Sequence, residues 1–192
     1  MEAVSVTRGG FFRKTQYPRN ASNKMVYIIT GGPGFGKTTL LNLLAERQFP
    51  VCQENVRALL SPDTNSGIPA DFERTIATER AYFLASTPPS TVAFSDRGLP
   101  DQVAYSWYKK KEPSAFILEM VNANSYAPIV FLTPPWKDIF VADRIRQESF
   151  EQAVAIHEEI VRAYLKFQYK IINLPLVNPV ERVQFILNFL GI

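Results

Sequence analysis

The chain has 192 residues, of which 46% are hydrophobic and 20% are charged, and these values predict one soluble globular domain. No apolar run approaches the roughly 20 residues that a membrane-spanning helix needs. The single cysteine, Cys52, excludes an internal disulfide. The net charge of +3 comes from residues 1–24, which hold five basic residues against Glu2 alone, so the rest is close to neutral. We therefore expect a cytoplasmic protein that binds neither nucleic acid nor membrane.

Residues 1–24 are polar and basic, and they lack apolar periodicity. We expect them to form a disordered arm ahead of a single nucleotide-binding domain at residues 25–192. An organellar transit peptide is an alternative for this arm, although Gly9, Gly10 and Pro18 interrupt any amphipathic helix. A translation start at Met25 is another alternative.

Short apolar runs alternate with helical patterns along the chain. The runs predict five strands, at residues 25–30, 49–52, 91–95, 129–132 and 170–174. Helical periodicity predicts helices at residues 37–47, 71–86, 100–108, 114–122, 150–169 and from 178 onward. Such alternation is typical of βαβ units with right-handed crossovers. We therefore expect an α/β protein of three layers, α/β/α, with a five-stranded parallel sheet.

The stretch after the first strand matches the pattern G-x-x-x-x-G-K-[ST]. Its glycines let successive N–H groups turn inward, and the helix that follows adds free N–H groups and the positive end of its dipole. Lys37 is placed to reach the β- and γ-phosphates, and Thr38 is placed to ligate Mg²⁺. We call residues 31–39 the phosphate loop: Gly31, Gly32, Pro33, Gly34, Phe35, Gly36, Lys37, Thr38 and Thr39. We expect it to bind ATP with Mg²⁺; a glycine-rich turn without a ligand is the alternative.

Acidic and basic residues also follow the second and third predicted strands. Asp96 and Arg97 end the third strand, where a carboxylate can bind Mg²⁺ directly or through water. A helix-capping role is the alternative for Asp96. Glu54 follows the second strand, at the edge where open parallel sheets display catalytic groups, and Arg57 lies on the next helical turn.

Residues 134–150 are predicted to form a lid that carries Arg144 and Arg146. Two arginines two positions apart do not share a helix face, but a mobile lid can place each on a different phosphoryl group. A solvated face of paired charges is the alternative.

The helix predicted at residues 150–169 is strongly amphipathic. Its expected apolar stripe consists of Phe150, Val154, His157, Val161, Tyr164 and Leu165. His157 is the only histidine of the chain, so we expect a structural role rather than metal binding.

A family resemblance is carried by six segments: GGPGFGKTTLL, FPVCQENVR, FSDRGLPD, FLTPPWKDIF, DRIRQESFEQAVAIHEEI and PVERVQFIL. The chain from residue 25 to 192 resembles a family of small ATPases with AAA-type ATP-binding domains that are built like nucleoside and nucleotide kinases. The resemblance implies a P-loop NTPase fold in which residues 31–38 bind ATP.

The same resemblance implies roles for individual residues. Asp96 and Arg97 are similar to the acid–arginine pair that thymidylate kinases carry after strand three. Glu54 is similar in position to the general base of deoxynucleoside kinases, and Arg144 and Arg146 resemble lid arginines.

The favoured function is a Mg-ATP-dependent kinase that transfers the γ-phosphoryl group to a small-molecule acceptor. Glu54 would accept the proton of the acceptor hydroxyl, and Arg57 and Arg97 would orient the acceptor. The alternative is an ATPase switch whose hydrolysis is sensed by a protein partner. A ring-forming motor is disfavoured because only about twenty residues follow the fifth strand, so we expect a monomer or dimer. The sequence leaves the acceptor open.

Overall fold

A five-stranded sheet lies at the centre of the computed structural model, which describes residues 25–53, 71–140 and 148–192. Its strands are β1 (Met25–Thr30), β2 (Val51–Cys52), β3 (Val92–Asp96), β4 (Ile129–Leu132) and β5 (Lys170–Asn173). They lie in the order β2-β3-β1-β4-β5, and every neighbouring pair is parallel. The expected five-stranded parallel sheet is confirmed.

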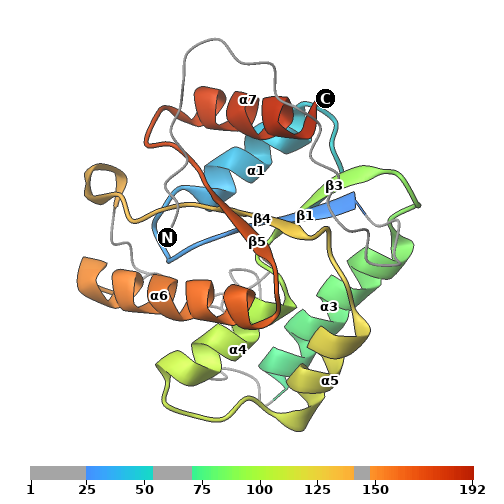
Figure 1. Ribbon diagram of the computed structural model, residues 1–192, viewed down its shortest axis with the longest axis vertical. Helices are drawn as coiled ribbons and strands as arrows, with labels where there is room; N and C mark the ends of the chain where they lie inside the picture. Colours follow the sequence, from blue (N-terminus) through green and yellow to red (C-terminus); the bar gives the residue numbers. More distant parts are fainter. Residues whose placement is uncertain (1–24, 54–70, 141–147) are drawn as a thin grey trace, which may run out of the picture.

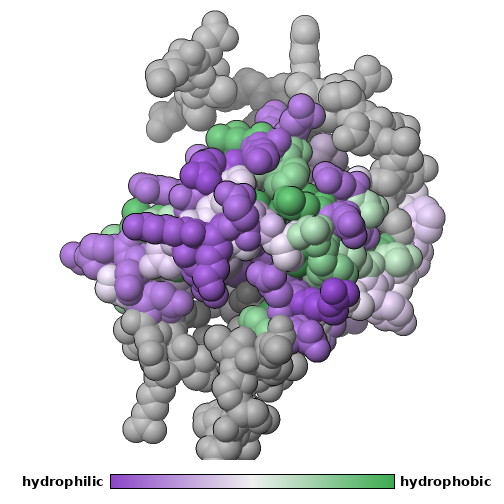
Figure 2. All heavy atoms as spheres, turned by 90° about the horizontal axis from the view of Figure 1, so that it is seen from below, coloured by the Kyte–Doolittle hydropathy of each residue, from purple (hydrophilic) through white to green (hydrophobic). Residues whose placement is uncertain are grey.

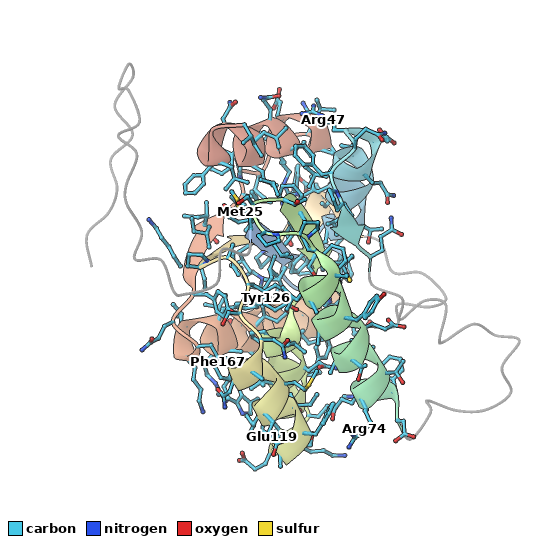
Figure 3. All side chains as sticks on the ribbon, turned by 90° about the vertical axis from the view of Figure 1, so that its right-hand side faces the viewer. Met25, Arg47, Arg74, Glu119, Tyr126 and Phe167 are labelled. Atoms are coloured by element: carbon cyan, nitrogen blue, oxygen red, sulfur yellow. The ribbon has the colours of Figure 1, made fainter. Side chains whose placement is uncertain are left out.

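Helices cover both faces of this sheet. They are α1 (Lys37–Glu46), α3 (Phe72–Ser86), α4 (Leu99–Tyr108), α5 (Ala115–Ala123), α6 (Phe150–Lys166) and α7 (Pro179–Leu190), with a short 3-10 helix, η1 (Lys137–Ile139). In Figure 1, α1 and α7 lie above the sheet, and α3, α4, α5 and α6 lie below it. Figure 3 shows the layers from the side, with Arg47 above, Met25 of β1 in the middle and Glu119 of α5 below. The predicted three-layer fold is confirmed.

The central strands are buried on both faces, as expected for a parallel sheet covered by helices. In β1, Val26 and Ile28 contribute to the core that includes α4, α5 and α6, whereas Ile29 contributes to the core formed with α1 and α7. In β4, Val130 and Phe131 divide between the two cores in the same way. The alternation of side chains along a strand explains why one short apolar run supplies both cores.

The buried face of α6 differs from the predicted apolar stripe. The buried side chains are Ala153, Ile156, His157, Ile160, Ala163 and Tyr164. Leu165, which was expected on the stripe, is 60% exposed. The cause is tertiary packing, because α6 lies against α4 along its length and against the phosphate loop near its start. Residue 32 must be a glycine for this approach, since a Cβ there would overlap the backbone carbonyl of Ala153.

The carboxyl edge of the sheet holds the predicted functional segments that the structure describes after β1 and β3. Figure 1 shows the connection after β1 and the N-terminal ends of α1, α6 and α7 on the same, left-hand side of the molecule. Ile29 of β1 is paired in register with Asp96 of β3, so two predicted site segments leave adjacent strands. Ligands of open parallel sheets bind at this edge.

Figure 2 shows the face of the molecule opposite α1 and α7, where hydrophilic side chains predominate around a smaller hydrophobic area. Leu118 of α5 and Tyr82 of α3 are among the described large apolar side chains that are exposed. Within the described residues, no helix is both long enough and apolar enough to cross a membrane.

Candidate functional site

The phosphate loop connects β1 to α1, and the glycines near its two ends show what the loop lies against. Gly31 has a φ of +139°, and a Cβ there would overlap the side chain and carbonyl of Thr133, just after β4. Gly36 has a φ of +85°, and a Cβ there would lie 3.2 Å from Arg182 Nη1 and from Ile139 Cδ1. Residues other than glycine rarely adopt such backbone φ angles. The backbone of the loop is therefore held close to β4 at one end and to α7 at the other.

The N-terminus of α1 receives no side-chain cap from the described residues. Gly36 occupies the N-cap position, and the first turn contains no acidic residue. By contrast, side chains of Ser114, Ser149 and Asn178 accept backbone N–H groups at the starts of α5, α6 and α7. The first N–H groups of α1 are therefore available to an anion, together with the positive end of the helix dipole.

Lys37 folds back over the phosphate loop. It is 6% exposed, and its Nζ donates to the carbonyl oxygens of Gly31 (3.0 Å) and Gly32 (2.8 Å). The ammonium group therefore lies at the β1 end of the loop. The lysine of such a loop reaches the β- and γ-phosphates.

The two predicted metal ligands come from adjacent elements. Thr38 is exposed in the first turn of α1, as is Thr39, and Asp96 is 4% exposed at the end of β3. The Nη2 of Arg80 lies 3.5 Å from the carbonyl oxygen of Asp96. No group of three or more His, Cys, Asp or Glu side chains in the described residues could hold a metal ion. A cation held by Thr38 and Asp96 would therefore need phosphate oxygens as further ligands, which is how Mg²⁺ is usually bound beside a nucleotide.

Arg97 is buried behind the phosphate loop. It is 4% exposed, and its φ of +64° is uncommon for a residue with a side chain. Its Nη1 donates to the carbonyl oxygen of Gly31 (3.0 Å) and to Oδ1 of Asp101 (3.2 Å). The centre of the Tyr105 ring lies 5.2 Å from the guanidinium carbon. Such strained backbone positions cluster at functional sites.

Asp101 is the centre of a buried hydrogen-bond network behind the loop. It is 1% exposed, and its Oδ1 accepts from Thr30 Oγ1 (2.5 Å) as well as from Arg97. Its Oδ2 accepts from the backbone N–H of Gly98 (2.8 Å) and from the Tyr164 hydroxyl (2.5 Å). Burial and the negative charge of Asp101 raise the pKa of Tyr164, so this hydroxyl remains a donor. The network joins β1, α4 and α6 and neutralises Arg97.

His157 of α6 lies against the phosphate loop. It is 9% exposed, and its ring centre is 6.0 Å from that of Phe35. Burial, and then the positive charge of Lys37, lower the pKa of His157 to about 4. The imidazole is therefore neutral near pH 7, and the loop beside it has a positive potential.

A cavity of about 270 Å³ opens between α3 and α4. Its lining is polar and charged, and it consists of Glu73, Tyr105, Ser106, Lys109, Lys111, Glu112 and Ser114. Tyr105 connects this cavity to Arg97, because the Arg97 guanidinium lies over the ring. Its volume falls just below the roughly 300–1,000 Å³ of most small-molecule sites, and its lining is more polar than theirs.

Four predicted site residues, Glu54, Arg57, Arg144 and Arg146, lie outside the described residues, together with the centre of the predicted lid. Their roles remain predictions. The predicted residues that are described lie at or just after the ends of the adjacent strands β1 and β3: residues 31–39 form the connection from β1 into the first turn of α1, Asp96 ends β3 and Arg97 follows it.

Two residues at this site had no recognisable functional signal in the sequence. Asp101 lies at the third position of α4, where an acidic residue is common as a helix cap. Its spacing of four from Arg97 is the one local clue to an ion pair. Arg182 is 2% exposed in α7 and contacts Phe35, which lies 147 residues away along the chain. No local pattern could have revealed that contact.

The family follows from a sequence match. Residues 26–182, which include nearly all of the segments described above, match the family profile described as AAA domain. The chain belongs to this AAA domain family. Among curated proteins, none matches its sequence.

Solved structures resemble this AAA-domain protein in fold. Thymidylate kinase from Ehrlichia chaffeensis has a TM-score of 0.60 at 16% identity, over 88% of this chain and 99% of the kinase. Deoxyadenosine kinase from M. mycoides has a TM-score of 0.62 at 12% identity, over 87% and 98%. The NadR protein in complex with NR has a TM-score of 0.66 at 17% identity, over 88% of this chain and 51% of NadR. The predicted P-loop NTPase fold of the nucleoside and nucleotide kinase type is thereby confirmed.

Proposed function

We propose that this AAA-domain protein is a Mg-ATP-dependent kinase that transfers the γ-phosphoryl group to a small hydroxylated or phosphorylated metabolite. The observation that carries the proposal is the convergence of two cations on the carbonyl of Gly31, Lys37 from α1 and Arg97 from the end of β3. The likeness in fold to thymidylate kinase and deoxyadenosine kinase supports a phosphotransferase and makes nucleosides and nucleotides the first acceptors to test.

The residues of the chain would divide the work as follows. ATP with Mg²⁺ supplies the phosphoryl group and part of the charge neutralisation when bound. The N–H groups of the phosphate loop would hold the phosphates, and Lys37 would donate to them in place of the Gly31 and Gly32 carbonyls. Thr38 and Asp96 would hold the cation. Because phosphoryl transfer depends mainly on positioning and electrostatic stabilisation, these contacts supply most of the catalysis.

The acceptor would bind over Tyr105, between Arg97 and the cavity of α3 and α4. Arg97 and Arg57 would orient it, and Glu54 would take the proton from its hydroxyl. Arg144 and Arg146 would add positive charge. We expect Tyr105→Ala to raise the KM for the acceptor more than the KM for ATP. Steady-state kinetics with each substrate varied in turn measure this difference.

An ATPase switch is the second candidate function, and one observation favours it. Arg97 is 4% exposed and donates to Gly31 and Asp101, so its guanidinium serves the protein rather than an incoming acceptor. A switch would hydrolyse ATP slowly, without regard to metabolites, and a protein partner would stimulate it.

The deciding experiment measures ATP consumption against a panel of nucleosides, nucleoside monophosphates and other hydroxylated metabolites. Calorimetry with MgATP comes first, since absence of binding by folded protein would contradict both candidates. Lys37→Ala is the blank, and its rate should be lower by about two orders of magnitude or more. Stimulation by one acceptor class, with phosphorylated product, supports the kinase. Slow turnover that no acceptor changes supports the switch.

A further inference from the structure

Arg182 lies where α7 meets the phosphate loop. Asn178 caps this helix, and Arg182 follows in its first turns with only 2% of its surface exposed. Its Nη1 is 3.5 Å from the carbonyl oxygen of Phe35 and 3.2 Å from the place that a Cβ of Gly36 would occupy. Its guanidinium carbon is 5.8 Å from the centre of the Trp136 ring. The cation therefore borders the loop at the end that leads into α1.

This buried cation is poorly compensated by the protein. Neither Nε nor Nη2 of Arg182 has a hydrogen-bond partner among the described residues. No carboxylate in residues 25–53, 71–140 and 148–192 forms an ion pair with it within 4.0 Å. Burial lowers the pKa of Arg182, which reflects the cost of removing its charge from water. Isolated buried charges are costly unless something pairs with them.

The groups around Arg182 carry the same sign. The N-terminus of α1 begins at Gly36 with uncapped N–H groups and a positive dipole. Lys37 adds a second cation at the other end of the loop, and its charge contributes, after burial, to the lowered pKa of His157. Like charges in a desolvated site repel. An anion at this end of the loop would pair with Arg182 and with the uncapped N–H groups of α1.

We infer that Arg182 binds the nucleotide by donating from its Nε and Nη2 edge to the α-phosphate. Lys37 lies at the other end of the loop, against the carbonyls of Gly31 and Gly32, where the β- and γ-phosphates are expected. The Gly36 end then faces the phosphate nearest the sugar. A planar guanidinium with two free donors suits phosphate oxygens. This inference rests on the proposed function, because it presumes that the loop binds a nucleotide.

Calorimetry with MgATP and MgADP tests the inference by binding alone. We expect Arg182→Met to raise the Kd for both nucleotides about tenfold, because the α-phosphate is common to both. Arg162→Met is the matched control. Arg162 also lies over a tryptophan ring, 4.0 Å from the centre of Trp107, but it is 59% exposed on α6, so its loss should leave both Kd values unchanged.

The outcomes separate this inference from the proposed function. Wild-type affinity in folded Arg182→Met would overturn the role of Arg182 and leave the function intact. Weaker ATP binding with unchanged ADP binding would overturn the assignment to the α-phosphate. If the wild type bound neither nucleotide, the proposed function itself would fall. Should Arg182→Met not fold, Arg182→Gln takes its place, because its amide keeps a polar donor in the site while the charge and the Nε and Nη2 edge are lost. It too should bind both nucleotides about tenfold more weakly.

Discussion

Two buried arginines border the phosphate loop, and the protein compensates their charges differently. Arg97, at the β1 end, donates to the carboxylate of Asp101, which also accepts from Thr30 and Tyr164. Arg182, at the α1 end, has two nitrogens without a hydrogen-bond partner among the described residues. Both side chains are at most 4% exposed, so solvent does not account for the difference.

The contrast separates a cation whose charge the protein already balances from one whose charge is left for a ligand to balance. A buried ion pair is destabilising when one partner is removed, because an uncompensated charge remains. A buried cation without a partner is already an uncompensated charge. The free-energy cost of burying it is offset only when an anion binds the folded state. The Arg97 side of the loop should therefore depend on its network, and the Arg182 side on its nucleotide.

The largest expected effect tests the compensated side. Asp101→Asn should lower the free energy of unfolding by about 3 kcal/mol, because it leaves the buried charge of Arg97 without a carboxylate. Urea unfolding with an unchanged m-value measures this loss. The double variant Asp101→Asn with Arg97→Met should recover part of it. A single variant as stable as the wild type would show that Arg97 does not depend on Asp101.

A second effect depends on pH. Because the pKa of His157 is lowered to about 4 from an ordinary 6.5, the unfolded chain takes up a proton first as the pH falls. The contribution of the neutral His157 to the free energy of unfolding is therefore fully present above pH 6.5. It declines as the pH falls towards 4, by at most about 2 kcal/mol at pH 5. Protonation also adds a further positive charge beside Lys37.

Unfolding at pH 7 and pH 5 measures this contribution against His157→Gln. The variant should lose less stability than the wild type over the same interval. Equal losses in both proteins would assign the pH dependence to other groups.

A smaller effect concerns one donor of the Asp101 network. Tyr164→Phe should cost about 1 kcal/mol, since Asp101 loses one of four hydrogen bonds while the packing of the ring is kept. Thermal unfolding measures the change. Tyr82→Phe is the matched control, because Tyr82 is 74% exposed on α3. The melting temperature of this variant should equal that of the wild type. Similar values for the two variants would mean that the Tyr164 hydroxyl contributes nothing to the network.

The smallest expected effect concerns Arg182, at the α1 end of the loop. Its test is the sign of the change in the free energy of unfolding. Without nucleotide, Arg182→Met should leave the free energy of unfolding unchanged or raise it by up to about 1 kcal/mol, because an apolar side chain of similar length replaces an unpaired charge. Arg97→Met should lower it. Denaturant unfolding of both variants in nucleotide-free buffer compares them, and equal destabilisation would abolish the contrast between the two arginines.

Much of the fold could be predicted because its signals are contiguous in the chain. The apolar runs at 25–30 and 129–132 coincide with β1 and β4, and the helix predicted from residue 37 is α1. The predicted strand at 49–52 is shorter in the structure, where β2 is Val51–Cys52, since an edge strand pairs only where its neighbour β3 is in register. Strand boundaries depend on pairing, which a local pattern does not contain.

In the phosphate loop, too, the local pattern was predictable and the long-range contact was not. Its glycines, Lys37 and Thr38 occupy consecutive positions, so their spacing alone indicated a phosphate site. The contact of His157 with Phe35 was not predicted, because the apolar stripe of α6 indicates only that a side chain is buried and not what it packs against.

The sequence by itself determined the alternation of strands and helices, the phosphate loop and the acid–arginine pair at the end of β3, because each is encoded in neighbouring residues. Only the tertiary structure decided which charges are compensated. Asp101 meets Tyr164 across 63 positions, and Arg182 meets Phe35 across 147. Folding brings such residues together by packing helices on a sheet, and the charge balance of a buried site depends on those long-range contacts.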